Sequence, residues 1–119
     1  MKPVRSVEVC IDVVDPRPVA AFWSALLDYT CSDDLDTARW VHLAPPAGLP
    51  VLNLQRVPES KETKNRLHLD VFVDDPFEWI ERAEALGATR LRLHDHDEDW
   101  FCVMADPAGN EFCLCREQL

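Results

Sequence analysis

The sequence has no long hydrophobic run and little positive charge, and each shortage argues against a class of protein. No stretch approaches the ~20 apolar residues of a membrane-spanning helix. The first residues, Met1 to Ser6, lack an apolar core of signal-peptide length. Twelve lysines and arginines against 22 aspartates and glutamates give a net charge of -10, which repels nucleic-acid phosphates and anionic membranes. We therefore expect a cytoplasmic protein with no nucleic-acid partner and no membrane partner.

Motifs for nucleotide binding and nucleophilic catalysis are also missing. The chain has only three glycines, and it contains no Gly-x-Gly-x-x-Gly fingerprint, no P-loop and no nucleophile elbow. The five cysteines form no Cys-x-x-Cys pair and no zinc-finger spacing. In a reducing compartment we interpret most of them as small buried hydrophobic residues. A length of 119 residues predicts a single domain with an ordinary hydrophobic core.

An internal repeat organises the chain. Shifting the sequence so that position 8 falls on position 68 aligns Glu-Val-Cys-Ile-Asp with His-Leu-Asp-Val-Phe, and Asp15-Pro16 with Asp75-Pro76. In both copies hydrophobic residues alternate with polar ones, as in a half-buried strand. The Asp-Pro pair then suits a helix N-cap followed by the first helical position. The sequence therefore predicts two copies of one structural unit.

Both copies predict the element order βαβββ, with an amphipathic helix after each Asp-Pro pair. In the first copy we expect strands at residues 7–13, 39–44 and 51–57, and a short edge strand within the acidic segment 31–37. In the second copy we expect strands at residues 66–73, 89–93, 100–105 and 111–116, with a charged turn at 94–99. This is an α+β fold with a first unit at 1–58, a linker at 59–65 and a second unit at 66–119.

Three motifs narrow this fold to a family: Lys64-Asn65-Arg66-Leu67-His68-Leu69-Asp70, Leu86-Gly87-Ala88-Thr89, and the closing Asp106-Pro107-Ala108-Gly109-Asn110-Glu111-Phe112-Cys113. With the tandem βαβββ units, they resemble the vicinal oxygen chelate superfamily. That superfamily includes glyoxalase I, extradiol dioxygenases, fosfomycin-resistance enzymes and bleomycin-binding proteins. Within it, the chain resembles a small glyoxalase-like domain family. The resemblance implies a curved mixed sheet with a concave cleft, a small-molecule ligand and a homodimer.

The resemblance also implies which positions hold a metal ion in the superfamily's metalloenzymes. One ligand comes from the first strand and one from the last strand of each unit, and these positions match Glu8, His68, Cys113 and either Asn53 or Gln55. A site of Glu8, His68, Gln55 and Cys113 would take a divalent ion such as zinc, nickel, manganese or iron. A neutral amide is a poor ligand for these ions, and a thiolate favours zinc. The cleft lining that we expect is Glu8, Asp12, Asn53, Gln55, His68, Asp70 and Cys113.

Two functions of different classes follow from these residues. One is a binding protein without a complete catalytic metal site, whose acidic lining from Glu8, Asp12 and Asp70 suits a cationic or hydrogen-bond-donating molecule. The other is a metal-dependent lyase, isomerase or dioxygenase of the glyoxalase type, which would use Glu8 and His68. His68-x-Asp70 also has the spacing of a two-histidine, one-carboxylate iron site, for which a histidine of the 94–99 turn would have to fold in.

Overall fold

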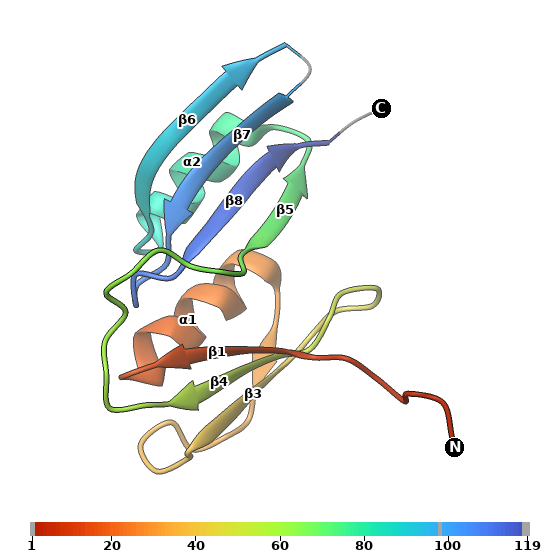
Figure 1. The fold of residues 1–119 in the computed structure, drawn as a ribbon, viewed down its shortest axis with the longest axis vertical. Helices are drawn as coiled ribbons and strands as arrows, with labels where there is room; N and C mark the ends of the chain where they lie inside the picture. Colours follow the sequence, from red (N-terminus) through yellow and green to blue (C-terminus); the bar gives the residue numbers. More distant parts are fainter. Residues whose placement is uncertain (1, 98, 118–119) are drawn as a thin grey trace. The chain divides into compact units, whose positions relative to one another are not determined.

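The structure is a computed structural model that describes residues 2–97 and 99–117. It confirms the α+β class, with two four-stranded mixed sheets and two helices (Figure 1). The elements are β1 (Val9–Val13), α1 (Pro16–Leu27), β2 (Thr30–Cys31), β3 (Trp40–Ala44), β4 (Leu52–Arg56), β5 (Leu69–Val73), α2 (Pro76–Ala85), β6 (Thr89–His96), β7 (Asp99–Ala105) and β8 (Glu111–Arg116). The chain divides into two compact units, Met1–Ser60 and Lys61–Leu119, and each is described by itself. Neither helix in the described ranges has the length and apolar composition needed to cross a membrane.

The two sheets have the same topology. Their strand orders are β1-β4-β3-β2 and β5-β8-β7-β6. In each unit the first and last strands pair in parallel, and the remaining pairs are antiparallel. Cys10 pairs with Asn53 in the first sheet, and Asp70 pairs with Cys113 in the second. The repeat seen in the sequence is therefore also a repeat of strand register.

Each helix begins at the Asp-Pro pair that the sequence predicts. The Asp15 carboxylate accepts a hydrogen bond from the backbone N–H of Arg17 at 3.1 Å at the start of α1. The Asp75 carboxylate accepts one from the backbone N–H of Glu78 at 3.4 Å at the start of α2. Gly87 follows α2 with a φ of +115°, a conformation that glycine adopts without steric cost. Local sequence therefore fixes where both helices begin and where α2 gives way to β6.

One face of each sheet packs against the helix of its own unit and forms the core. Side chains alternate along a strand, so the opposite face of the same strand is left for other uses. The fully buried members of the first core include Val13, Val19, Phe22, Trp23, Leu26, Val41, Leu43, Leu52 and Leu54. Those of the second core are Ile80, Ala83, Cys102, Met104, Phe112 and Leu114. The candidate site residues lie on the faces that do not contact the helices.

The first strand of each unit is shorter than predicted. β1 begins at Val9 and β5 at Leu69, where each strand meets its parallel partner in the ladder. Val7 and Leu67, which continue the hydrophobic alternation backward, are 84% and 86% exposed. The hydrophobic alternation alone therefore overestimated the length of both strands, because it does not show where the partner strand ends.

The predicted turn at residues 94–99 is wrong in its first half. β6 continues to His96 and β7 begins at Asp99, so His94 and His96 belong to a strand. His94 stacks on Phe101 of the neighbouring strand, with ring centroids 4.6 Å apart. β6 lies at the end of the strand order, and His94 is the only one of its residues that is not exposed. An exposed edge strand needs no hydrophobic alternation, so its charged residues looked like a turn.

Candidate functional site

A cleft of about 820 Å³ opens on the second unit. Its walls come mainly from the face of the β5-β8-β7-β6 sheet that does not contact α2. The lining residues are His68, Asp70, Phe72, Asp97, Asp99, Trp100, Phe101, Cys113, Cys115, Arg116 and Glu117. Among the cleft residues that the sequence predicted are His68, Asp70 and Cys113.

The cleft has an apolar base. Val103, Cys113 and Cys115 are buried and form one cluster, against which Phe101 packs. Strand register explains the grouping, because Val103 lies opposite Cys113 and Phe101 lies opposite Cys115. Residues opposite each other in a ladder point to the same face of the sheet. The two cysteines of β8 are therefore part of the surface that a ligand would meet.

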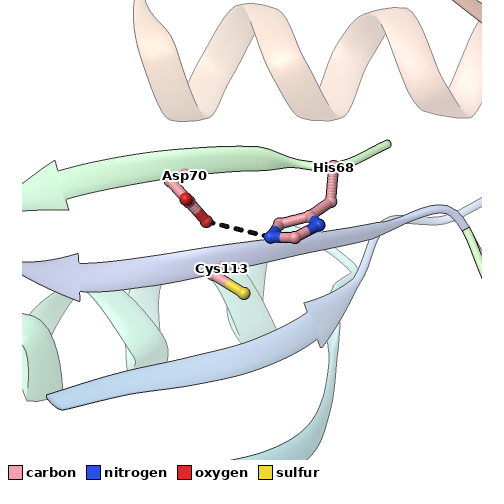
Figure 2. A group of neighbouring side chains, drawn as sticks. All are labelled: His68, Asp70 and Cys113. Carbon is pink, nitrogen blue, oxygen red and sulfur yellow. Dashed lines mark ion pairs between the residues drawn. The ribbon is translucent and has the colours of Figure 1, made fainter. Parts of the chain in front are cut away.

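His68 and Asp70 form a pair at the edge of this base. His68 lies just before β5, and its Nε2 is 3.2 Å from Oδ1 of Asp70 (Figure 2). Both side chains are about half exposed, so their mutual attraction contributes little to folding stability. A carboxylate can only accept hydrogen bonds, whereas each nitrogen of a neutral imidazole either donates or accepts according to the tautomer. The pair thus offers both a negative charge and an imidazole nitrogen to a ligand.

The thiols of β8 are held in their neutral form. Burial, followed by the negative charge of Asp70, raises the pKa of Cys113 to about 11. The same two causes raise the pKa of Cys115 to about 12. Thiolates are the nucleophilic form of cysteine, so neither residue is activated as a nucleophile at neutral pH. This supports the interpretation of both as buried apolar residues unless a metal ion displaces the proton.

His68, Asp70 and Cys113 also form the one group of at least three histidine, cysteine or acidic side chains, within residues 2–97 and 99–117, that could hold a metal ion. Their ligand atoms all lie within 4.8 Å of one another (Figure 2). An imidazole, a carboxylate and a thiolate are together a donor set that suits zinc, and three protein ligands leave a position open. Manganese and iron prefer nitrogen and oxygen donors over a thiolate. The residues present therefore fit a metal ion, with zinc as the best match.

The site residues predicted in the first unit lie on the outward face of the β1-β4-β3-β2 sheet, which is the face that does not contact α1. Asn53 Nδ2 donates a hydrogen bond to Glu8 Oε1 at 2.7 Å. Gln55 lies opposite Asp12 in the β1–β4 ladder, and its Oε1 is 4.0 Å from the thiol of Cys10. Asn53 pairs with Cys10 in the first unit as Cys113 pairs with Asp70 in the second. Because Cys10 and Asp70 are equivalent positions of the repeat, Asn53 and not Gln55 is the counterpart of Cys113. The metal site that combines Glu8 and Gln55 with residues of the second unit stays a prediction.

Several residues that line the cleft were not predicted from the sequence. Asp97, Asp99, Phe101, Arg116 and Glu117 line the cleft of the second unit. Asp97 and Asp99 were assigned to a solvated turn. The spacing of Asp99, Phe101 and Val103 could have predicted that they line one surface, since alternate residues of a strand share a face. It was hidden because the start of β7 was predicted one residue late, at Trp100.

Residues 8–115 match the family described as "glyoxalase-like domain". One similar solved structure is a variant of the fosfomycin resistance protein FosX from Listeria monocytogenes, complexed with Mn(II) and 1S,2S-dihydroxypropylphosphonic acid. It is 16% identical, with a TM-score of 0.77 over 98% of this chain and 94% of that one. A lactoylglutathione lyase from Agrobacterium tumefaciens is 21% identical, with a TM-score of 0.66 over 98% and 96% of the two chains. A glyoxalase/bleomycin resistance protein/dioxygenase family enzyme from Burkholderia phytofirmans is 17% identical, with a TM-score of 0.73 over 92% and 95%. None of the curated proteins matches the chain.

Proposed function

The chain belongs to the glyoxalase-like domain family, and from this premise we propose that it binds a small, positively charged molecule in the cleft of its second unit. The volume of the cleft supports this proposal. Clefts that bind small molecules commonly enclose roughly 300–1,000 Å³, and this one encloses about 820 Å³. Such sites combine an apolar lining with a few polar groups, as the thiol and aromatic base with its charged surroundings does here.

The charge of the lining is the observation that carries the proposal. Four carboxylates surround the cleft, from Asp70, Asp97, Asp99 and Glu117, against the single guanidinium of Arg116. The net charge of the whole chain, -10, has the same sign. A concave surface lined by one sign of charge raises the local concentration of the opposite ion. The cleft therefore attracts a cation and repels an anion of the same shape.

Aromatic rings give the ligand a second requirement. Phe72 lines the cleft and is 63% exposed, although it is a large apolar residue. Phe101 lines the same cleft from β7. An aromatic ring attracts a cation through its face and packs against flat apolar groups. We therefore propose an amine or a similar cation attached to an apolar or aromatic body.

Isothermal titration with three probes of similar shape tests this function. We expect 2-phenylethylamine to bind, 2-phenylethanol to bind more weakly, and 3-phenylpropanoate not to bind. Asp99→Asn and Asp70→Asn should each weaken binding of the amine, whereas Glu81→Gln, on the exposed side of α2, should not. Equal binding of the amine and the carboxylate would contradict the proposal.

A second candidate function is a metal-dependent lyase, isomerase or dioxygenase of the glyoxalase type. It is favoured by the His68, Asp70 and Cys113 group and by the presence of Mn(II) in the similar FosX complex. In this function His68 and Cys113 would hold the ion, with Asp70 as a further ligand or as the acceptor for the His68 N–H. The family resemblance implies Glu8 and either Asn53 or Gln55 as further ligands, and the strand register of the first unit favours Asn53. A bound divalent ion would act as a Lewis acid on an oxygen of the substrate.

Metal content decides between the two functions. Protein purified without a histidine tag should contain stoichiometric zinc or manganese if the second function holds. His68→Ala should then lose the metal, whereas His96→Ala, on the exposed edge strand, should keep it. Protein that is free of metal, and whose amine binding survives chelation, would exclude the metalloenzyme.

The homodimer implied by the family stays a prediction, which sedimentation equilibrium tests.

A further inference from the structure

Glu8, Asn53 and His42 form a chain of hydrogen bonds on the outward face of the first unit's sheet. Asn53 Nδ2 donates to Glu8 Oε1 at 2.7 Å, and Asn53 Oδ1 lies 2.6 Å from Nδ1 of His42. His42 and Asn53 are opposite each other in the β3–β4 ladder. The backbone N–H of His42 donates to the carboxylate of Asp33 at 2.7 Å. The backbone of His42 is therefore fixed by Asp33, and its imidazole is oriented by Asn53 of the neighbouring strand.

The hydrogen bonds in this chain have only one possible direction. An ionised carboxylate only accepts, so the group of Asn53 that faces Glu8 must be the NH₂. The amide oxygen then faces His42, and this oxygen also only accepts. The hydrogen between Asn53 and His42 must therefore sit on Nδ1 of His42. Because a neutral imidazole carries a single N–H, Nε2 is left with its lone pair.

We propose that this chain fixes His42 as a hydrogen-bond acceptor through Nε2, and that Nε2 and Trp40 form a binding subsite. Its ligand is a flat ring that carries an O–H or N–H donor. Nε2 makes no hydrogen bond with any residue that the structure describes, and the His42 side chain is exposed. Trp40 precedes His42 by two positions on β3, so both side chains point to the same face.

The exposure of Trp40 supports a ligand beside His42. Its side chain is 49% exposed on a strand whose alternate residues, Val41 and Leu43, are fully buried. The guanidinium of Arg39 lies 5.1 Å from the centre of the Trp40 ring, which restrains the ring on one side. A restrained, half-exposed indole is a stacking surface for another flat group. A ring stacked there would bring a substituent within reach of the neighbouring imidazole, since alternate strand residues lie roughly 6–7 Å apart.

A hydrogen-bond donor fits this subsite better than a metal ion does. Within the described ranges, the one group of three ligand atoms close enough to share an ion lies in the second unit. Glu8 and Asn53 occupy positions that the family resemblance assigns to metal ligands, but here they bond to each other and to His42. Their effect in this unit is to orient an imidazole. The inference concerns the first unit and is independent of the cationic ligand proposed for the second.

Nitrogen NMR tests the tautomer directly. In protein labelled with ¹⁵N-histidine, at a pH where the imidazoles are neutral, we expect His42 to carry its hydrogen on Nδ1. Asn53→Leu should return His42 to the Nε2–H form that free imidazole side chains favour, while Gln55→Leu on the same face should not. Glu8→Gln gives a second test that keeps the amide, because a glutamine lets Asn53 turn either way and should produce a mixture. An Nε2–H form in the unmodified protein, or an unchanged tautomer in these Asn53 and Glu8 variants, would overturn the proposal.

A pair of neutral probes tests the subsite. Phenol carries an O–H donor, and anisole is the same ring with the donor methylated. We expect phenol, but not anisole, to shift the Nε2 resonance of His42, and we expect Trp40→Leu to abolish the effect. Asp99→Asn in the second unit should leave the phenol response unchanged, which separates this result from the cationic cleft. Equal shifts with both probes, or no shift with phenol, would refute the subsite.

Discussion

Asp70 stands directly opposite Cys113 in the parallel ladder of β5 and β8, and its carboxylate acts on both thiols of β8. Burial is the larger cause of the raised pKa of each thiol, and the charge of Asp70 is the next. The carboxylate of Asp70 therefore contributes to the negative charge of the cleft and, together with burial, keeps the two thiols of its base neutral.

Asp70→Asn should lower the pKa of Cys113 and of Cys115, because the negative charge that opposes their ionisation is removed. Both pKa values should stay above that of an ordinary cysteine, since burial remains. The measurement is the pH dependence of alkylation by iodoacetamide in the presence of a chelator, followed by peptide mass spectrometry. Glu81→Gln is the matched control and should leave both profiles unchanged. Profiles that are identical in Asp70→Asn and the unmodified protein would contradict this role of Asp70.

Leu114→Ala should destabilise the second unit by about 2–5 kcal/mol, because it leaves a cavity in a close-packed core. Leu114 is fully buried in β8, on the face opposite the cleft. Leu91→Ala, in the same unit but at a half-exposed position, should change stability by only about 0.5 kcal/mol. Urea unfolding of the two variants makes the comparison. Similar losses from both would mean that the core does not lie between β8 and α2.

Glu111→Gln should reduce stability near neutral pH and have little effect in acid. The hydrogen bond from Lys64, at 2.6 Å, is the main cause that lowers the pKa of Glu111, and Lys61 lies 3.5 Å away. A folded pKa below the unfolded value adds stability above the unfolded pKa, and this stability is lost as pH falls through the folded pKa.

The ion pair with Lys64 is largely open to solvent on the lysine side, so we expect a loss of about 1 kcal/mol at neutral pH. Denaturant unfolding at about pH 7 and about pH 3 compares a pH above the ordinary pKa of a glutamate with one below it. Glu62→Gln is the control, because Glu62 is an exposed acid of the same segment. A loss of the same size at both pH values would show that Glu111 acts through packing and not through its charge.

Asp75→Ala should cost about 1 kcal/mol by removing the N-cap of α2, whereas Asp75→Asn should retain most of the stability. The carboxylate accepts the backbone N–H of Glu78, and the carbonyl of an asparagine can accept the same bond. Thermal unfolding followed by circular dichroism distinguishes the two variants. Equal destabilisation by alanine and asparagine would indicate that the cap acts through its charge.

The features that the sequence predicted well depend on neighbours along the chain. An aspartate before a proline predicts the start of a helix, and both Asp15 and Asp75 cap helices as expected. Alternation within a strand assigned His68 and Asp70 to one face. These are local properties, and the repeat reinforced each assignment by stating it twice.

The features that the sequence did not predict depend on partners far along the chain. The choice between Asn53 and Gln55 as the counterpart of Cys113 required the register between β1 and β4. Predicting the role that we propose for His42 required the register between β3 and β4, because its hydrogen bond with Asn53 crosses from one strand to the other. Hydrophobic alternation gives the face of a residue but not the residue opposite it, so neither could be derived.

The edge strand β6 has a consequence for the behaviour of the protein in concentrated solution. Its outer side faces no strand of the described sheet, so its backbone groups are a template on which another chain could add a strand. Arg90 and Arg92 lie on either side of a shift in the β6–β7 register. The shift interrupts the regular ladder, and the two arginines add positive charge to the edge. Arg90 is held there by Glu84, at 3.0 Å. Irregularity and positive charge are two features that oppose pairing with another chain at such an edge, and replacing both arginines by threonine would remove the charge and leave the edge more open to self-association.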